Sequence, residues 1–123
     1  MKGEIINFFG EFLRELRIKK EISLRELARK LKMDVGNLSK IETGKMKPPI
    51  KGEFIEDLSI ILKLNKKEKE KLIDLASHEN GEYPRDIKET LKESQYIPVL
   101  LRTISNRKLS DKKIKELTKK LNT

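Results

Sequence analysis

The side chains that most often act as nucleophiles, general bases or metal ligands are scarce in this sequence. The chain of 123 residues contains no cysteine and a single histidine. That histidine, His78, stands beside Glu79, but a lone histidine in a predicted linker is usually an exposed polar residue. A zinc site or a catalytic triad needs several such groups together. We therefore expect no enzyme, no catalytic residue, no metal site and no cofactor.

Positive charge is the more informative chemical feature, because its distribution is uneven. The formal net charge is +9. Residues 17–51 contain 11 basic and 4 acidic residues and residues 84–123 contain 11 and 5, whereas residues 52–83 contain 5 and 8. Such local concentrations are typical of surfaces that bind phosphates. Lysine-rich surfaces are also common in AT-rich or thermophilic genomes, so charge alone leaves the partner open.

The elements that position these charges are predicted to be helices, because apolar residues recur at three- and four-residue steps. Two capping boxes, Ser23 with Glu26 and Asn65 with Glu68, mark helix starts, and Asp34 is a further N-cap. No segment has the alternation of a strand. The pattern predicts helices over residues 5–20, 24–31, 35–43, 54–64 and 66–76, and three more that begin at Pro84, Pro98 and Ser110.

Two breaks interrupt this helical pattern. Residues 45–52 include two prolines and are predicted to form an extended loop, and residues 77–83 are predicted to be a linker. We therefore expect two domains, 1–78 and 84–123. Because the chain has no apolar run of about 18 residues and begins with acidic residues at helical spacing, we expect neither a membrane span nor a signal peptide, and a cytoplasmic location.

Residues 22–48, ISLRELARKLKMDVGNLSKIETGKMKP, have the pattern of a helix-turn-helix. This motif needs two short helices that cross at a large angle, with apolar inner faces, and a second helix whose outer face is free for the major groove of DNA. Ala28 is small where the helices approach each other. Inner positions are Leu27, Ala28, Leu31, Met33, Leu38 and Ile41; outer positions are Val35, Gly36, Asn37, Ser39 and Lys40.

The segment from about Phe9 to Ala76 resembles the lambda-repressor-like, or XRE and Cro-C1, family of helix-turn-helix regulators. The resemblance rests on SLRELARKL, NLSKIETGK and LSIILKLNKKEKEKLIDLA, and most of all on residues 38–44, which match an LSxIExG signature. It implies an all-α fold: a five-helix DNA-binding domain followed here by a short C-terminal helical region. It also implies that double-stranded DNA is the partner.

By this resemblance, the outer residues of the helix at 35–43 read base edges in the major groove. Lys40 is the candidate for guanine O6 and N7, Asn37 for an adenine edge, and Val35 for a thymine methyl group. Ser39 and Gly36 complete the base-reading set. Gly36 has no side chain at a position where the family often has a polar reader.

The resemblance also implies contacts that hold the DNA backbone and a pair that holds the fold. Arg17 and Glu42 match a pair that joins the first helix to the end of the third. Leu24 stands where many members have a phosphate-binding glutamine, for which Arg25 and the amides of that helix start could substitute. The residues expected at the phosphates are Ser23, Arg25, Thr43, Lys45 and Lys47.

The C-terminal helices carry apolar stripes that need a partner. About 40 residues do not easily enclose an effector, whereas a helical pair can bury its stripe against a second copy. We therefore expect a homodimer, with docking within one chain as the alternative. The dimer contacts are assigned to Tyr96, Val99, Leu100, Ile104 and Leu117. The basic residues of the same region, Arg107, Lys108, Lys112, Lys113 and Lys115, either contact DNA or keep the protein soluble.

The function expected from these features is sequence-specific transcriptional regulation, as a repressor that binds an inverted repeat as a homodimer. One alternative is an antitoxin of the same fold, whose tail neutralises a toxin and whose helix-turn-helix represses its own operon. A second alternative is an architectural protein that binds DNA without reading sequence, which the departures at Leu24 and Gly36 would fit.

Overall fold

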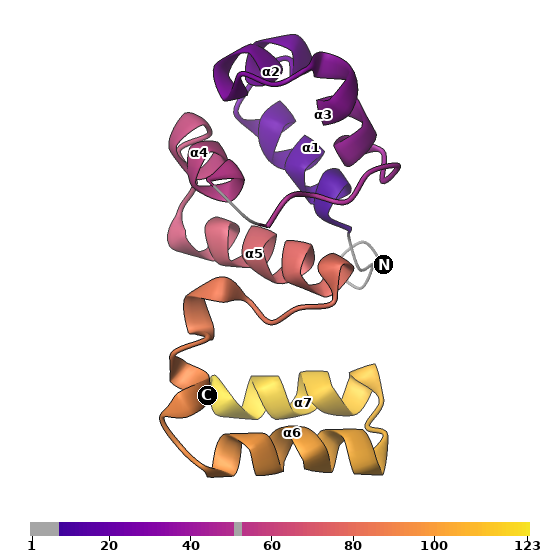
Figure 1. Cartoon of the computed structure of the whole chain (residues 1–123), viewed down its shortest axis with the longest axis vertical. Helices are drawn as coiled ribbons and strands as arrows, with labels where there is room; N and C mark the ends of the chain where they lie inside the picture. The colour runs from indigo at the N-terminus through magenta and orange to yellow at the C-terminus, as the bar shows by residue number, and fades with distance from the viewer. Residues whose placement is uncertain (1–7, 51–52) are drawn as a thin grey trace. The chain divides into compact units, whose positions relative to one another are not determined.

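The structure is a computed structural model that describes residues 8–50 and 53–123 (Figure 1). Every regular element among these residues is helical, so the predicted all-α class is confirmed. The α-helices are α1 (Phe9–Lys19), α2 (Leu24–Leu31), α3 (Val35–Glu42), α4 (Phe54–Ile61), α5 (Lys66–Asn80), α6 (Tyr96–Arg107) and α7 (Asp111–Leu121). Two short 3₁₀ helices, η2 (Arg85–Ile87) and η3 (Thr90–Lys92), stand between α5 and α6.

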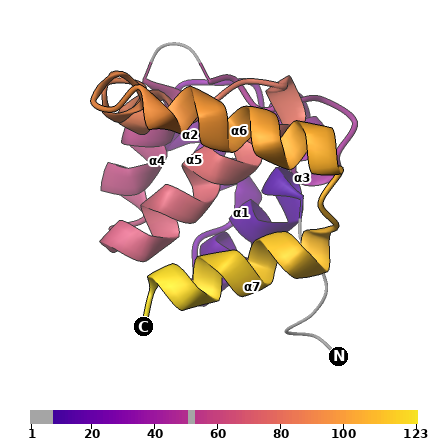
Figure 2. The ribbon, with the colours of Figure 1, turned by 90° about the horizontal axis from the view of Figure 1, so that it is seen from below.

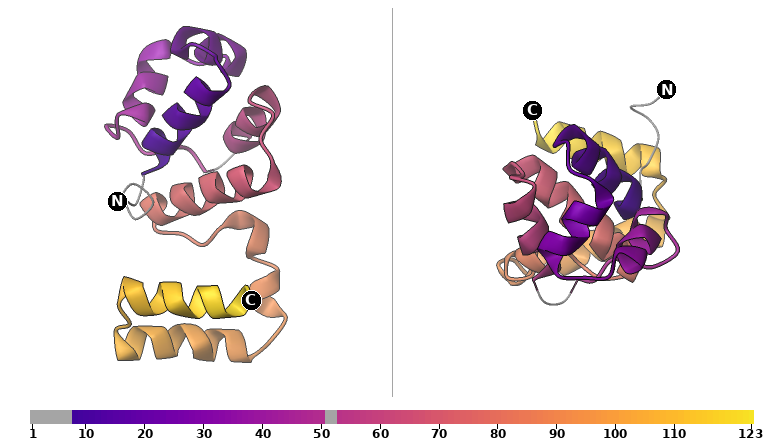
Figure 3. Two further views of the ribbon diagram at one scale, coloured as in Figure 1. Left: turned by 180° about the vertical axis from the view of Figure 1, so that it is seen from behind. Right: turned by 90° about the horizontal axis from the view of Figure 1, so that it is seen from above.

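The chain divides into two compact units, residues up to 85 and residues 86–123. In the first unit, α1 packs against α3 on one side and α5 on the other, while α2 contacts both α3 and α4, as the views from behind and above show (Figure 3). Its core consists of Phe9, Leu13, Leu16, Leu27, Ala28, Leu38, Ile41, Leu58, Leu62, Leu72 and Ala76, each at most 3% exposed. This core fixes the two helices of the predicted helix-turn-helix.

Most of the predicted helix starts agree with the structure. Ser23, Asp34, Asn65 and Ser110 each accept a hydrogen bond from the backbone N–H three residues on. The box at Asn65 is complete, because the Glu68 carboxylate accepts from the Asn65 N–H at 3.0 Å. The box at Ser23 is not: the Glu26 carboxylate accepts from Arg29 at 2.6 Å. That part of the prediction was wrong, because a cation one turn along the helix is the stronger partner.

Helix boundaries differ from the prediction at several points. α1 ends at Lys19, and Ile5, part of the predicted first helix, lies outside the described residues, as do Lys51 and Gly52 at the end of the predicted loop. α4 ends at Ile61, three residues before the predicted end. α5 continues to Asn80, so the first four residues of the predicted linker are helical.

The second unit begins differently from the sequence pattern. The α-helix predicted at Pro84 is absent, and that segment forms η2 and η3. Their tighter i to i+3 bonding suits short connecting segments. α6 starts at Tyr96, so Pro98 is its third residue rather than its first, a place where the missing N–H has no intrahelical partner.

α6 and α7 run antiparallel in Figure 1, whereas Figure 2 shows their axes diverging from the turn that joins them. None of the residues 86–123 is buried. The two helices therefore share no closed core within this unit.

Candidate nucleic-acid interface

The turn between α2 and α3 is short and is closed by backbone hydrogen bonds. Lys32 ends α2 in the left-handed region, at φ 57°, and its N–H donates to the Arg29 carbonyl at 3.1 Å. The Met33 N–H donates to the Ala28 carbonyl at 3.0 Å. These bonds satisfy carbonyls at the end of α2 and direct the chain to Asp34, which caps α3. The angle between the two helices is thus fixed by backbone bonds as well as by packing.

The inner and outer faces of these helices are divided as the sequence predicted. Leu27, Ala28, Leu38 and Ile41 are buried, and Leu31 and Met33 are half-buried against the same core. On the outer side, Val35, Gly36, Asn37 and Lys40 are exposed, while Ser39 is half-buried. α3 therefore presents a free surface from the same residues that were assigned to base reading. Contact of these residues with bases stays a prediction.

The start of α1 packs closely against α3 on the side away from its exposed face. A Cβ atom on Gly10 would meet the Ile41 carbonyl oxygen and would lie 2.6 Å from that of Glu42. A residue with a side chain does not fit there, so glycine allows α1 to touch the backbone of α3. No local pattern in the sequence indicates this role of Gly10.

Arg17 connects three parts of the fold. Its Nε and Nη2 donate to the two carboxylate oxygens of Glu42 at 2.7 and 3.1 Å, and its Nη1 donates to the Ile22 carbonyl at 3.0 Å. The side chains are 12% and 5% exposed. This bidentate pair ties α1 to the end of α3, and the third bond holds the segment that leads into α2. Arg17 thereby fixes the position of α2 relative to α3.

The loop after α3 folds back on the helix end. Gly44 has φ 83°, and the Lys45 and Met46 N–H groups both donate to the Lys40 carbonyl, at 2.8 and 3.1 Å. Lys45 and Lys47 are exposed. The Thr43 hydroxyl, predicted to bind phosphate, donates to the Ser39 carbonyl at 2.9 Å. A phosphate contact through that proton would first have to break this bond.

The charges near α3 are largely unneutralised. Within the described part of the chain, no carboxylate forms an ion pair with Arg25, Lys40, Lys45 or Lys47. On α2, Glu26 pairs with Arg29 and Lys30, and the hydrogen bond from Arg29 lowers the pKa of the Glu26 carboxyl. Ser23, the cap of α2, accepts from the Glu26 N–H and keeps its hydroxyl proton available to a phosphate.

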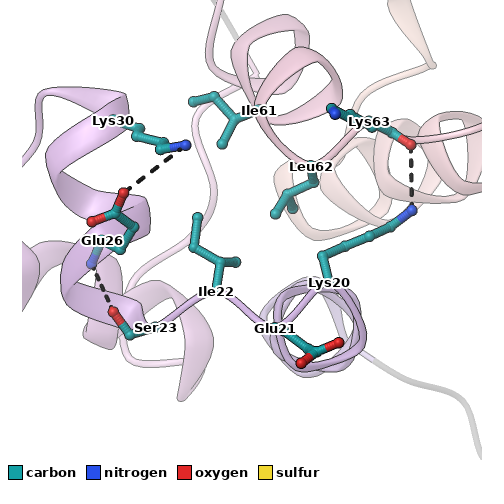
Figure 4. Close-up of a pocket in the computed structure, with 9 residues that line it drawn as sticks. All are labelled: Lys20, Glu21, Ile22, Ser23, Glu26, Lys30, Ile61, Leu62 and Lys63. Carbon is teal, nitrogen blue, oxygen red and sulfur yellow. Dashed lines mark hydrogen bonds and ion pairs between the residues drawn. The ribbon is translucent and has the colours of Figure 1, made fainter.

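An open crevice of about 710 Å³ lies beside the start of α2 (Figure 4). Its apolar lining is Ile22, Ile61 and Leu62, and its polar rim includes Lys20, whose ammonium donates to the Lys63 carbonyl at 3.3 Å. No local pattern in the sequence indicates this crevice, because one side comes from residues 20–30 and the other from residues 61–63.

The end of α5 also supports this region, through contacts that no local sequence pattern indicates. The Glu79 carboxylate accepts from the Phe9 N–H at 2.6 Å and so caps α1. The Asn80 side-chain amide donates to the carbonyls of Ala76 at 2.8 Å and Pro48 at 3.0 Å. The last turn of α5 therefore holds both the start of α1 and the loop that follows α3. His78, in the same turn, is exposed.

Comparison with known families decides what this arrangement is. The sequence model of a family described as a helix-turn-helix domain matches residues 9–72. The chain belongs to this helix-turn-helix family. The match spans α1 to the middle of α5 and supports DNA as the partner of the first unit. It does not distinguish the lambda-repressor-like type from other helix-turn-helix families. Searches among curated proteins and among solved structures gave no match.

No helix among the described residues is long and apolar enough to cross a membrane. Among the same residues, His, Asp and Glu side chains form no cluster that could hold a metal ion.

Proposed function

We propose that this helix-turn-helix protein is a sequence-specific transcriptional regulator of the lambda-repressor-like type. The observation that carries the proposal is the outer face of α3, where Asn37 and Lys40 are exposed on a helix whose inner face is fully buried. A fixed helix with free polar side chains is what major-groove reading requires. In this proposal Lys40 contacts guanine, Asn37 contacts adenine, and Val35 contacts a thymine methyl group.

The backbone contacts of the proposal come from both ends of the motif. Ser23 and Arg25 stand at the start of α2, and Lys45 and Lys47 stand on the loop after α3, all with exposed side chains. Phosphate contacts at these two places would fix the register of α3 in the groove without specifying sequence. In this proposal the protein acts in the cytoplasm as a repressor, which blocks polymerase by occupying a promoter.

The second unit supports the dimeric form of the proposal. Tyr96, Val99 and Leu100 on α6 are 72%, 57% and 55% exposed, and Leu117 on α7 is 39% exposed. Ile104, the remaining predicted contact, is half-buried. A unit without a buried residue gains most by covering such a face, and a second copy does so symmetrically. The dimer then places two α3 helices on half-sites about 34 Å apart.

The proposal is tested by selecting bound sequences from random duplex DNA, with the wild type, Lys40→Ala and Lys67→Ala in parallel at one salt concentration. Lys67 is an exposed lysine on α5 and serves as the matched control. We expect an enriched inverted repeat that loses its preference at one position per half-site with Lys40→Ala only. The loss of one good base contact costs about 1–3 kcal/mol of discrimination.

Other outcomes of this selection would favour the other functions. Tight, salt-sensitive binding without any enriched sequence would indicate an architectural protein, consistent with the missing side chain at Gly36. An enriched site bound tightly only together with a second, toxin-like protein would indicate an antitoxin whose α6 and α7 hold that protein. Either result would contradict the proposed function.

A further inference from the structure

The most basic stretch of the second unit is the α6–α7 hairpin, residues 96–123. It contains eight basic and two acidic residues, all of them exposed. One acid, Glu116, lies 3.7 Å from Lys113, and the other, Asp111, is in the first turn of α7. Most of this charge therefore remains unneutralised within the hairpin.

The lysines of α7 are arranged on one side of the helix. At 100° per residue, Lys112, Lys115 and Lys119 share the face opposite Ile114, Leu117 and Leu121. From Lys112 to Lys119 the helix rises about 10 Å, a length over which one DNA strand presents about three phosphates. We call these three lysines the lysine stripe.

The stripe and the proposed dimer contacts use different surfaces. Tyr96, Val99 and Leu100 belong to α6, and Leu117 is on the opposite side of α7 from the stripe. Covering the apolar residues with a second copy thus leaves the lysine stripe facing solvent. Lys112 and Lys119, at the two ends of the stripe, are exposed and available for a charged partner in the same assembly.

We propose that the lysine stripe binds DNA phosphates beyond those that the helix-turn-helix contacts, an inference that rests on the proposed function. The connection from Gly81 to Gln95 has 15 residues and can span at most about 50 Å. Once the first unit has bound a site, this connection keeps the hairpin at a high local concentration of duplex DNA. Neighbouring phosphates are then the nearest abundant anions.

A basic amphipathic helix also suits an anionic membrane surface, but two observations favour DNA. The apolar side of α7 has three aliphatic residues and no aromatic anchor, and Ile114 is already half-buried. Furthermore, the chain carries a helix-turn-helix domain, which supports DNA as its partner. The test below therefore also measures binding to a membrane.

The test compares the full-length double variant Lys112→Ala, Lys119→Ala with a control, Lys66→Ala, Lys67→Ala, which removes the same charge from α5. Alanine has the higher helix propensity, so neither variant endangers its helix. Affinity for the selected duplex is measured against salt concentration. We expect the stripe variant to reduce the steepness of the salt dependence by roughly one to two contacts per protomer, with base preference unchanged. The control should match the wild type.

Several results would overturn the inference. One is an unchanged salt dependence in the stripe variant, and another is an equal reduction in the control. A third is binding of wild type, but not of the stripe variant, to vesicles of phosphatidylcholine and phosphatidylserine while the DNA salt dependence is unaffected. A failure of the proposed function looks different, because base preference itself would then be absent from the wild type and unaffected by Lys40→Ala.

Discussion

At the scale of single residues, Gly10 and Gly36 show opposite constraints. Gly10 lies against the carbonyl oxygens of Ile41 and Glu42, whereas a Cβ on Gly36 would meet only the Asp34 carboxylate, at 2.8 Å from Oδ2. The first neighbour is rigid helix backbone and the second is a side chain that can turn. A side chain at Gly10 should therefore destabilise the fold, whereas a side chain at Gly36 should be tolerated.

We expect Gly10→Ala to lower the free energy of unfolding by about 2 kcal/mol or more, because α1 must move away from α3. Gly36→Ala should change it by less than about 1 kcal/mol, since the gain in helix propensity offsets the displaced cap. Denaturant unfolding followed by circular dichroism measures both. Equal stability of the two variants would show that the close contact at Gly10 is not formed.

Arg17 is expected to be the most sensitive charged residue. Arg17→Met leaves the Glu42 carboxylate buried without its partner, which costs about 3–5 kcal/mol for a buried pair. Arg29→Met is the control, because Arg29 and Glu26 are 68% and 40% exposed and such pairs contribute at most about 1 kcal/mol. Thermal unfolding distinguishes the two. Similar losses in both variants would mean that the Arg17 pair is solvated in solution.

Among the helices, starts that have a side-chain cap could be predicted, whereas ends that depend on tertiary contacts could not. Ser23, Asp34, Asn65 and Ser110 were recognised because a cap bonds within its own turn. The end of α5 at Asn80 was missed because its bonds reach Phe9 and Pro48, 70 and 32 residues away from Glu79 and Asn80. The α-helix expected at Pro84 was wrong, and the short 3₁₀ helices η2 and η3 form there instead.

The outer face of α3 could be predicted because, like a cap, it depends only on residues that are near in sequence. Helical periodicity separates Leu38 and Ile41 from Asn37 and Lys40 without knowledge of any distant contact. The crevice beside α2 depends on how separate helices pack, so no local pattern in the sequence indicates it.

The cap that Glu79 provides for α1 can be tested directly. We expect Glu79→Ala to lower the free energy of unfolding by about 1–2 kcal/mol, because the Phe9 N–H loses its acceptor. Glu82→Ala, in an exposed residue three positions on, should have little effect. Native-state hydrogen exchange adds a local readout, with faster exchange at the start of α1 in the first variant only. Unchanged exchange there would contradict the cap.

The capping box of α5 predicts a dependence of stability on pH. The backbone N–H of Asn65 bonds to the Glu68 carboxylate and lowers the pKa of Glu68 below its ordinary 4.5. A carboxyl whose pKa is depressed by folding stabilises the fold above its unfolded pKa, and this contribution is lost as pH falls through the folded pKa. Between about pH 5 and pH 3, we expect the free energy of unfolding to fall less steeply in Glu68→Gln than in the wild type. An identical pH profile for both proteins would rule out this role for Glu68.

For the molecule as a whole, we propose that the first unit binds DNA and that the second unit holds two copies of the chain together. We expect Leu100→Lys to shift the protein from dimer to monomer, because a buried apolar anchor contributes about 2 kcal/mol or more to an interface. Ile60→Lys is the control, since Ile60 on α4 is 73% exposed but belongs to the other unit. Sedimentation equilibrium measures the outcome. If Ile60→Lys dissociates the dimer and Leu100→Lys does not, the interface lies in the first unit.

We propose above that α3 reads the major groove through Lys40. Methylation interference on the selected duplex is the sharpest test of this contact. Methylation of guanine N7 blocks the atom that the Lys40 ammonium is proposed to contact. We expect that one methylated guanine per half-site prevents binding of the wild type and of Lys67→Ala, and has no further effect on Lys40→Ala. If the same guanines interfere equally with all three proteins, or if none interferes with the wild type, Lys40 does not read this groove.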